Sequence, residues 1–186
     1  MENTIDEILH KGNFTSYRKL INKEKGVNGY EYLHEDRCNG NIISILPYRL
    51  NNDIVRRDNP YDFLLRYEMT PCWDMEKNVY SSITGGVDIG DDVVESVLKE
   101  LKEEAGYTVT KDELIYLGTC FGTKSSDTTY YLFTVNLSYK EEGEATGDGS
   151  YLEDQAHCEW VDDISVAEDP LVYTSFYRMT REGITF

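Results

Sequence analysis

One amphipathic segment, delimited by glycines on both sides, constrains the fold of this sequence more than any other feature. Apolar residues recur in it at steps of three and four: Val94, Val97, Leu98, Leu101 and Ala105. This spacing is typical of a helix that buries one stripe. Asp91 or Asp92 can cap its start, and Gly106 suits a left-handed C-terminal cap. Gly85 and Gly86, a short way upstream, allow a tight turn into the helix.

Three glutamates share one side of the predicted helix, away from its apolar stripe. Glu100, Glu103 and Glu104 fall within an arc of about 100°. Carboxylates at this spacing repel one another unless cations lie between them, and Mg²⁺ prefers such oxygen ligands in sites that also hold substrate phosphates. From spacing alone, an ordinary solvated acidic face remains the alternative.

The elements around this helix indicate a layered α/β protein. We expect helices near residues 6–23 and 171–180. Strand patterns occur at 30–34, 41–50, 62–69, 78–84, 114–121, 129–137 and 157–161. The Asn39-Gly40 turn signal suggests a hairpin between the first two strands. Strands mixed with a central and a closing helix favour two or three packed layers over a helical bundle or a β-sandwich.

The charge balance excludes several classes of partner. Thirty-five acidic against eighteen basic residues give a net charge of −17, which argues against nucleic acid and anionic membranes as partners. An anionic substrate would have to bind together with a cation. The sequence shows neither a run of roughly 20 apolar residues nor the apolar core of a signal peptide, so we expect a cytoplasmic protein.

The sequence from Gly85 to Tyr107 resembles the Nudix box without a gap. That pattern is a glycine, five residues, a glutamate, seven residues, Arg-Glu, an aliphatic residue, any residue, Glu-Glu, any residue, a glycine and an apolar residue. Asp91 stands where the family has glutamate, and Lys99 where it has arginine. Aspartate is one methylene shorter, and lysine lacks the planar fork of arginine. In the family, the positions of Asp91, Lys99 and Gly106 mostly support the geometry of the loop and the helix.

The resemblance implies a Nudix hydrolase that cleaves a diphosphate linked to another moiety. It implies an α/β/α sandwich on a mixed sheet, with residues 41–186 as the hydrolase domain. Residues 1–40 would be an extension that holds the N-terminal helix and the first strand of the β-hairpin. Glu100, Glu103 and Glu104 would be the ligands of Mg²⁺ or Mn²⁺, and the last two also count as catalytic. Gly85 and Gly86 would lie beside the substrate.

Weaker similarity points to the ADP-ribose and nucleotide-sugar pyrophosphatases of that family. Their N-terminal hairpin often helps to form a homodimer. They also carry an arginine-bearing strand upstream of the box, which 63–68 copies in part. There Arg66 would contact a substrate phosphate or a second subunit, or else form a structural ion pair, and Glu68 breaks the second basic position. Trp73 would stack on a base or pack beneath its loop.

A further acid in such enzymes comes from a loop late in the chain. Glu153 is our choice for the general base, because it precedes a strand that ends in Trp-Val as in similar enzymes. Asp154 and Glu144 are the runners-up, and His157 is the histidine alternative. Solvation of the loop is the competing interpretation of these acids. Two other functions stay open: a Nudix-fold nucleotide sensor without hydrolysis, and an acidic interaction protein.

Overall fold

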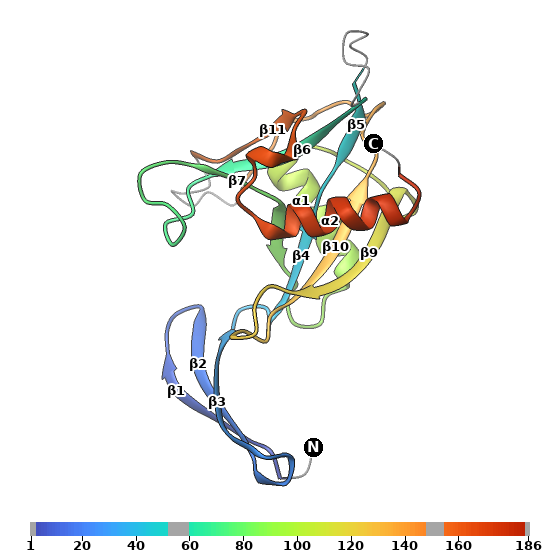
Figure 1. Ribbon diagram of the computed structural model, residues 1–186. Coiled ribbons are helices and arrows are strands. Elements are labelled where there is room, and N and C mark those ends of the chain that lie inside the picture. Colours follow the sequence, from blue (N-terminus) through green and yellow to red (C-terminus); the bar gives the residue numbers. More distant parts are fainter. Residues whose placement is uncertain (1–2, 52–59, 148–154, 185–186) are drawn as a thin grey trace.

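The computed structural model describes residues 3–51, 60–147 and 155–184. Its first part is a separate antiparallel sheet in the order β1-β2-β3, which extends away from the rest of the chain (Figure 1). These strands are β1 (Ile5–Lys11), β2 (Thr15–Asn22) and β3 (Val27–Glu35). The sheet joins the body where the amide of Leu33 donates to the carbonyl of Ser125 and where His34 Nδ1 lies 2.8 Å from Asp127 Oδ2.

Two further sheets form the body. The first has the order β8-β4-β10-β9: β8 (Ile83–Gly86), β4 (Asn41–Ile45), β10 (Thr129–Val135) and β9 (Leu114–Phe121). Its β4–β10 pair is parallel and its other pairs are antiparallel, so the sheet is mixed as expected. The second is antiparallel in the order β11-β6-β5, and β7 also pairs with β6: β11 (His157–Val161), β6 (Tyr61–Glu68), β5 (Tyr48–Leu50) and β7 (Val79–Ser81).

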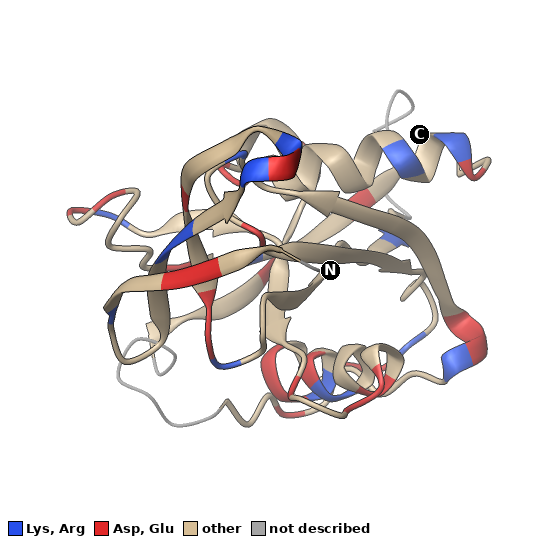
Figure 2. Cartoon of the chain, turned by 90° about the horizontal axis from the view of Figure 1, so that it is seen from below, with Lys and Arg blue, Asp and Glu red and all other residues tan. Residues whose placement is uncertain are grey.

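Two helices, α1 (Val93–Ala105) and α2 (Pro170–Arg181), cover opposite faces of these sheets (Figures 1 and 2). Successive residues of β10 show the two sides. Phe133 packs in the cluster that contains α1, whereas Leu132 packs in the cluster that contains α2. This alternation is the period of two of a strand that is buried on both faces. The arrangement is an α/β/α sandwich.

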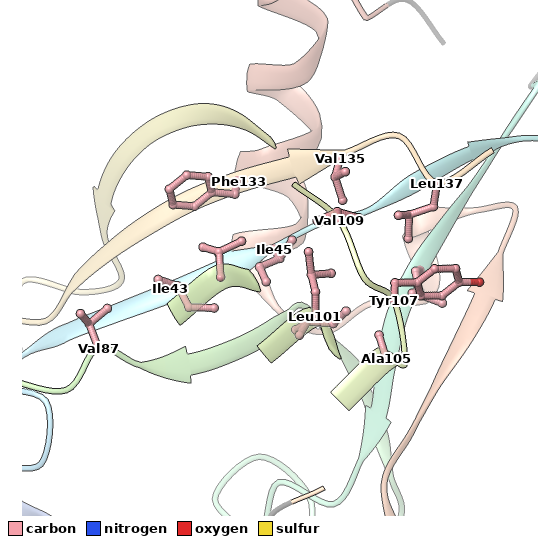
Figure 3. Packing of buried hydrophobic residues seen from close by; sticks show 13 residues of the cluster. Ile43, Ile45, Val87, Leu101, Ala105, Tyr107, Val109, Phe133, Val135 and Leu137 are labelled. Carbon is pink, nitrogen blue, oxygen red and sulfur yellow. The ribbon is translucent and has the colours of Figure 1, made fainter. Parts of the chain in front are cut away.

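The apolar stripe of α1 anchors the helix to the first sheet. Val97 and Leu101 have no exposed surface, and Ala105 is also buried. They pack against Ile43 of β4 and Phe133 of β10, among others (Figure 3). Burying such side chains supplies the main free energy that holds a helix of this length in place. The opposite flank of α1 is therefore left for polar residues.

Caps fix both ends of α1 where the sequence predicted them. The Asp92 carboxylate accepts hydrogen bonds from the amides of Val94 and Glu95, so Asp92, rather than Asp91, supplies the N-terminal cap. Gly106 has a φ of 73°, and its amide donates to the carbonyls of Leu101 and Lys102. The closing helix predicted at 171–180 corresponds to α2, with Asp169 as its cap.

The predicted N-terminal helix is wrong, because residues 6–23 form most of β1 and β2. Gly12, which interrupts the loose helical spacing, lies in the turn between the two strands, and its amide donates to the carbonyl of Thr15. Arg18 of β2 then joins neighbouring segments, with its guanidinium 3.0 Å from Asp6 and 2.9 Å from Asp36. Pairing between strands, absent from any local pattern, decides this region.

The predicted hairpin between 30–34 and 41–50 is also wrong. Asn39 and Gly40 do turn the chain, with φ values of 49° and 73°. The turn, however, leads from one sheet into another: β3 pairs with β2, and β4 pairs with β8 and β10. The boundary between an extension at 1–40 and a domain at 41–186 stays a prediction.

Two predicted strands are divided in the structure. Residues 41–50 become β4 and β5, because the chain changes sheets near Pro47, whose carbonyl accepts from the amide of Leu64. Residues 78–84 become β7 and β8 around Ser82, whose amide and hydroxyl both donate to Asp169. The strands predicted at 62–69, 114–121, 129–137 and 157–161 are confirmed. No helix in the described ranges is long and apolar enough to cross a membrane.

The cap of α1 gives the first prediction. Replacing Asp92→Ala leaves two amides of the first helical turn without their acceptor, so we expect the free energy of unfolding to fall by about 1 kcal/mol. Asp91→Ala is the matched control and should change it by no more than about 0.5 kcal/mol. Urea denaturation measures both, and equal losses in the two variants would contradict the assignment of the cap.

Candidate functional site

A charged cavity of about 340 Å³ lies where α1 faces β8, β6 and the turn after β3. Both carboxylates and cationic side chains line it, together with two glycines of β8. The charged lining residues are Glu68, Glu100, Glu103, Glu104, Arg37, Arg66 and Lys99. All three glutamates predicted from the helix spacing are therefore in one cavity.

The helix presents these glutamates at different depths. The Glu104 side chain is only 13 % exposed, whereas that of Glu103 is 36 % exposed. Lys99, one turn before Glu103, places its Nζ 4.0 Å from the Glu103 carboxylate. Figure 2 shows the acidic residues that gather on α1. The lysine that replaces the arginine of the box thus lines the cavity, while Asp91 is exposed just before the helix.

Gly85 makes room for the carboxylate of Glu100. A Cβ built on Gly85 would lie 2.3 Å from the Glu100 carboxyl carbon, closer than any real contact. The absence of a side chain at this position therefore lets Glu100 lie directly against β8. At Gly86, a Cβ would lie 3.2 Å from the Cβ of Cys38. The two glycines thus allow Glu100 and Cys38 to pack closely against β8.

Arg66 is held between two carboxylates. It comes from β6, is 4 % exposed, and lies 3.5 Å from both Glu68 and Glu104. Of the alternatives that the sequence left open, the structure shows the ion pair. A contact of Arg66 with substrate or with a second subunit stays a prediction. Glu68, which breaks the family pattern, is thus a partner of Arg66, and it also accepts a hydrogen bond from Ser81 at 2.7 Å.

Arg37 is a cavity residue that the sequence analysis missed. It lies in the turn between β3 and β4, and its side chain is 65 % exposed. The last residue of β3 and the turn between β1 and β2 hold its guanidinium: Nε lies 2.9 Å from Glu35, and the guanidinium carbon lies 5.0 Å from the ring centre of Phe14. No local motif marks this arginine. Only the way the first sheet joins the body brings it to the cavity.

The loop after β10 is joined to the end of α1. The amides of Thr146 and Gly147 both donate to the carbonyl of Glu103, and Gly147 lines the cavity. Glu144 of this loop is exposed and is not among the described residues that line the cavity. Glu153 and Asp154, the other candidates for the general base, lie outside the described residues.

The histidine alternative is held by a carboxylate of its own strand. His157 begins β11, and its Nε2 lies 2.7 Å from a carboxylate oxygen of Glu159. The same carboxylate accepts a hydrogen bond from Tyr80, and these two contacts lower the pKa of Glu159. His157 is not among the described residues that line the cavity.

The chemistry of the cavity fits a hard divalent cation. Carboxylate oxygens are the ligands such ions prefer, and the space that a Cβ at Gly85 would fill is occupied by one of them. As they stand, no three Asp, Glu, His or Cys side chains in the described ranges are grouped closely enough to enclose a metal ion. Glu104 instead faces the cationic Arg66. The assignment of metal ligands therefore stays a prediction.

Comparisons with known proteins support the fold and leave the family open. Neither the family models nor the curated proteins give a match. Among solved structures, the chain is similar to one described as "Crystal structure of ADP compounds hydrolase". The TM-score is 0.62 at 14 % sequence identity, over 97 % of this chain and 95 % of that chain. Together with the topology, this similarity confirms the expected fold class, a Nudix-like α/β/α sandwich.

The close approach of Gly85 and Glu100 generates a prediction. Gly85→Ala should displace the Glu100 carboxylate and weaken Mg²⁺ binding about tenfold, measured by calorimetry. The fold should tolerate the methyl group, because the end of the Glu100 side chain can move and because φ at Gly85 is not in the left-handed region.

A double-variant cycle provides the control. In a Glu100→Ala background, the same Gly85→Ala change should have no further effect on Mg²⁺ affinity, since the carboxylate that it displaces is gone. An equal loss in both backgrounds would show that Gly85 acts by another route. An original chain that binds no Mg²⁺ at millimolar concentrations would contradict the ligand assignment itself.

Proposed function

We propose that this chain is a Nudix-type hydrolase that cleaves the diphosphate of a nucleoside diphosphate linked to another moiety. The observation that carries the proposal is the meeting of Glu100, Glu103 and Glu104 with two arginines in one cavity. The similarity to an ADP compounds hydrolase supports the choice of substrate class. ADP-ribose and nucleotide sugars are the members of that class that we expect.

The charges of the cavity explain how so acidic a chain would bind a diphosphate. The protein as a whole carries a net charge of −17, yet Arg37, Arg66 and Lys99 all line this cavity. Arginine forks match phosphate oxygens in two parallel hydrogen bonds. Arg37 is the most exposed of the three and has a guanidinium already oriented by Glu35 and Phe14. It is suited to contact the substrate first.

Glu100, Glu103 and Glu104 would hold Mg²⁺, or Mn²⁺ in its place. When bound, such a cation neutralises phosphate charge and makes water a better nucleophile. The Glu104 carboxylate lies 3.5 Å from the Arg66 guanidinium, so binding would require Glu104 to be shared between Arg66 and the cation. A carboxylate of the loop after β10 would take the proton of the attacking water, and Glu153 remains our choice for it.

The N-terminal sheet is the part that we propose to form a homodimer. Several of its apolar side chains are more than a third exposed: Ile5, Ile8, Leu9, Phe14, Tyr17, Tyr30 and Leu33. Apolar side chains gathered on one small sheet favour burial against a partner surface. Since Arg37 is oriented by this sheet, the dimer contact and the cavity would be neighbours.

The glutamates provide the main test of the proposed function. We expect Glu103→Gln and Glu104→Gln each to lower kcat about a hundredfold or more, because each removes a charge that the transition state requires. Circular dichroism should show an intact fold. Glu95→Gln is the control on the same helix, since Glu95 pairs with Lys111 outside the cavity. Phosphate release from a panel of diphosphates, with Mg²⁺ added or chelated, measures the effect.

Two results would contradict this proposal. Near-normal turnover by either variant at saturating Mg²⁺ would remove these glutamates from the mechanism. Binding of a nucleotide without hydrolysis of any diphosphate in the panel would favour the sensor instead.

Arg37 allows a separate prediction about substrate binding. Arg37→Ala should raise KM about tenfold, the effect of losing one charged hydrogen bond to phosphate. It should leave the midpoint of thermal unfolding nearly unchanged, because the side chain is mostly exposed. Arg181→Ala, at the end of α2, removes an equal charge far from the cavity lining and should leave KM unchanged. Equal KM values for both variants would show that Arg37 contributes only net charge.

A further inference from the structure

A second cavity, of about 420 Å³, adjoins the charged one. Ile42, Glu68 and Thr84 line both, so the two spaces meet along β4, β6 and β8. The volume is in the range of pockets that bind small molecules, roughly 300–1,000 Å³. A ligand with its diphosphate among the glutamates would therefore reach the second cavity with the group attached to that diphosphate.

The second cavity differs from the first in its chemistry. Aromatic and aliphatic side chains form much of its wall: Trp73, Tyr130, Ile42 and Leu171. None of its described lining residues is Lys, Arg or His. Its two acids already accept hydrogen bonds: Glu68 from Ser81, and Asp169 from Ser82 and the amide of Leu171. This wall suits an uncharged ring rather than a further anionic group.

Trp73 provides an open aromatic face in this cavity. The sequence allowed it to stack on a base or to pack beneath its loop. In the structure the side chain is 50 % exposed, at a turn in which the amides of Trp73 and Asp74 both donate to the carbonyl of Thr70. A large apolar side chain left half open to solvent at a cavity wall is available to a ligand.

Tyr130 forms a more rigid part of the same wall. It comes from β10, and a Cβ built on Gly122 would lie 3.0 Å from its ring. The loop at Gly122 and Thr123 therefore lies directly against the tyrosine, and Thr123 adds a hydroxyl to the cavity. Trp73 in its turn, Tyr130 of β10 and a few hydroxyl groups together suit a flat ring that carries some polar atoms on its edge.

We infer that the nucleobase of the substrate binds in this second cavity against Trp73, while the diphosphate lies among the glutamates of α1. The inference rests on the proposed function for the position of the diphosphate. It adds that the nucleobase end of the substrate is recognised, and that Trp73 recognises it. Stacking of a base on an aromatic side chain tolerates any base. The hydroxyls of Thr70, Thr84 and Thr123 are then the groups that can distinguish base edges.

The chain offers a clean measurement, because it contains two tryptophans in different surroundings. Trp160 is partly buried and packs against the core cluster around α1, with the guanidinium carbon of Arg49 4.1 Å from its ring centre. Its ring also makes an edge contact with Tyr107. A ligand in the second cavity would therefore change the fluorescence of Trp73 and leave that of Trp160 nearly unaltered.

The experiment titrates the full chain and two variants, Trp73→Phe and Trp160→Phe, with AMP, GMP, CMP, UMP and ribose 5-phosphate. These ligands contain no diphosphate, so no turnover interferes. We expect at least one nucleoside monophosphate to quench the original chain and Trp160→Phe, and to leave Trp73→Phe unquenched. Ribose 5-phosphate, which lacks a base, should not quench.

Calorimetry with the nucleotide that binds best gives a second readout that does not depend on the Trp160 variant. Trp73→Ala should weaken its binding about tenfold, and Trp73→Phe should weaken it less because a ring remains. Equal affinities of Trp73→Ala and the original chain would overturn the inference.

The remaining outcomes separate the two proposals. If the chain hydrolyses diphosphates but no nucleotide affects Trp73, the base site is wrong and the hydrolase stands. If nucleotides quench Trp73 but no diphosphate is cleaved, the base site stands in a binding protein. If ribose 5-phosphate quenches as strongly as the nucleotides, the cavity takes the sugar and the inference of a base site fails.

Discussion

The repulsion among three carboxylates on one flank of α1 is the constraint around which the rest of the site is arranged. Glu100, Glu103 and Glu104 would weaken an isolated helix. The neighbouring apolar stripe offsets this cost, because Val97 and Leu101 are fully buried against the first sheet. Hydrophobic burial of the stripe thus stabilises the acidic surface beside it. That acidic surface forms part of the wall of the charged cavity.

Each glutamate meets a different compensating feature. Glu104 faces the buried guanidinium of Arg66, Glu103 has Lys99 one turn earlier, and Glu100 lies in the space that Gly85 leaves open. These partners come from β6, from α1 itself and from β8. The core positions all three elements, so the electrostatics of the site depend on the packing around the helix. A change that loosens α1 from the sheet would disperse the charges as well.

Local signals predicted those parts of the fold that local forces decide. The apolar stripe, a cap at Asp91 or Asp92 and the left-handed Gly106 fix α1 within its own sequence, and the strand predicted at 157–161 is likewise confirmed. Residues 6–23 were misassigned because their spacing suits a weak helix, whereas Gly12 and the cross-strand contacts of Arg18 make two strands. The pairing of a strand depends on segments far away in the chain, and no window of sequence contains them.

In the candidate site, too, local sequence predicted some residues, whereas others depend on distant segments of the chain. The position of the three glutamates on one side of α1 could be predicted from their spacing, whereas their role as metal ligands, and the place of Gly85 beside the substrate, follow only from the resemblance to the Nudix box. Arg37 could not be found, because its place depends on how a separate sheet joins the body. The sequence left Trp73 undecided, since the choice between packing and exposure depends on what surrounds the turn that carries it. In the proposed function, the glutamates that would hold the cation lie close together in α1, whereas Trp73, which would contact the base, comes from a distant segment. Under this proposal, a change of substrate preference would not require a change in α1.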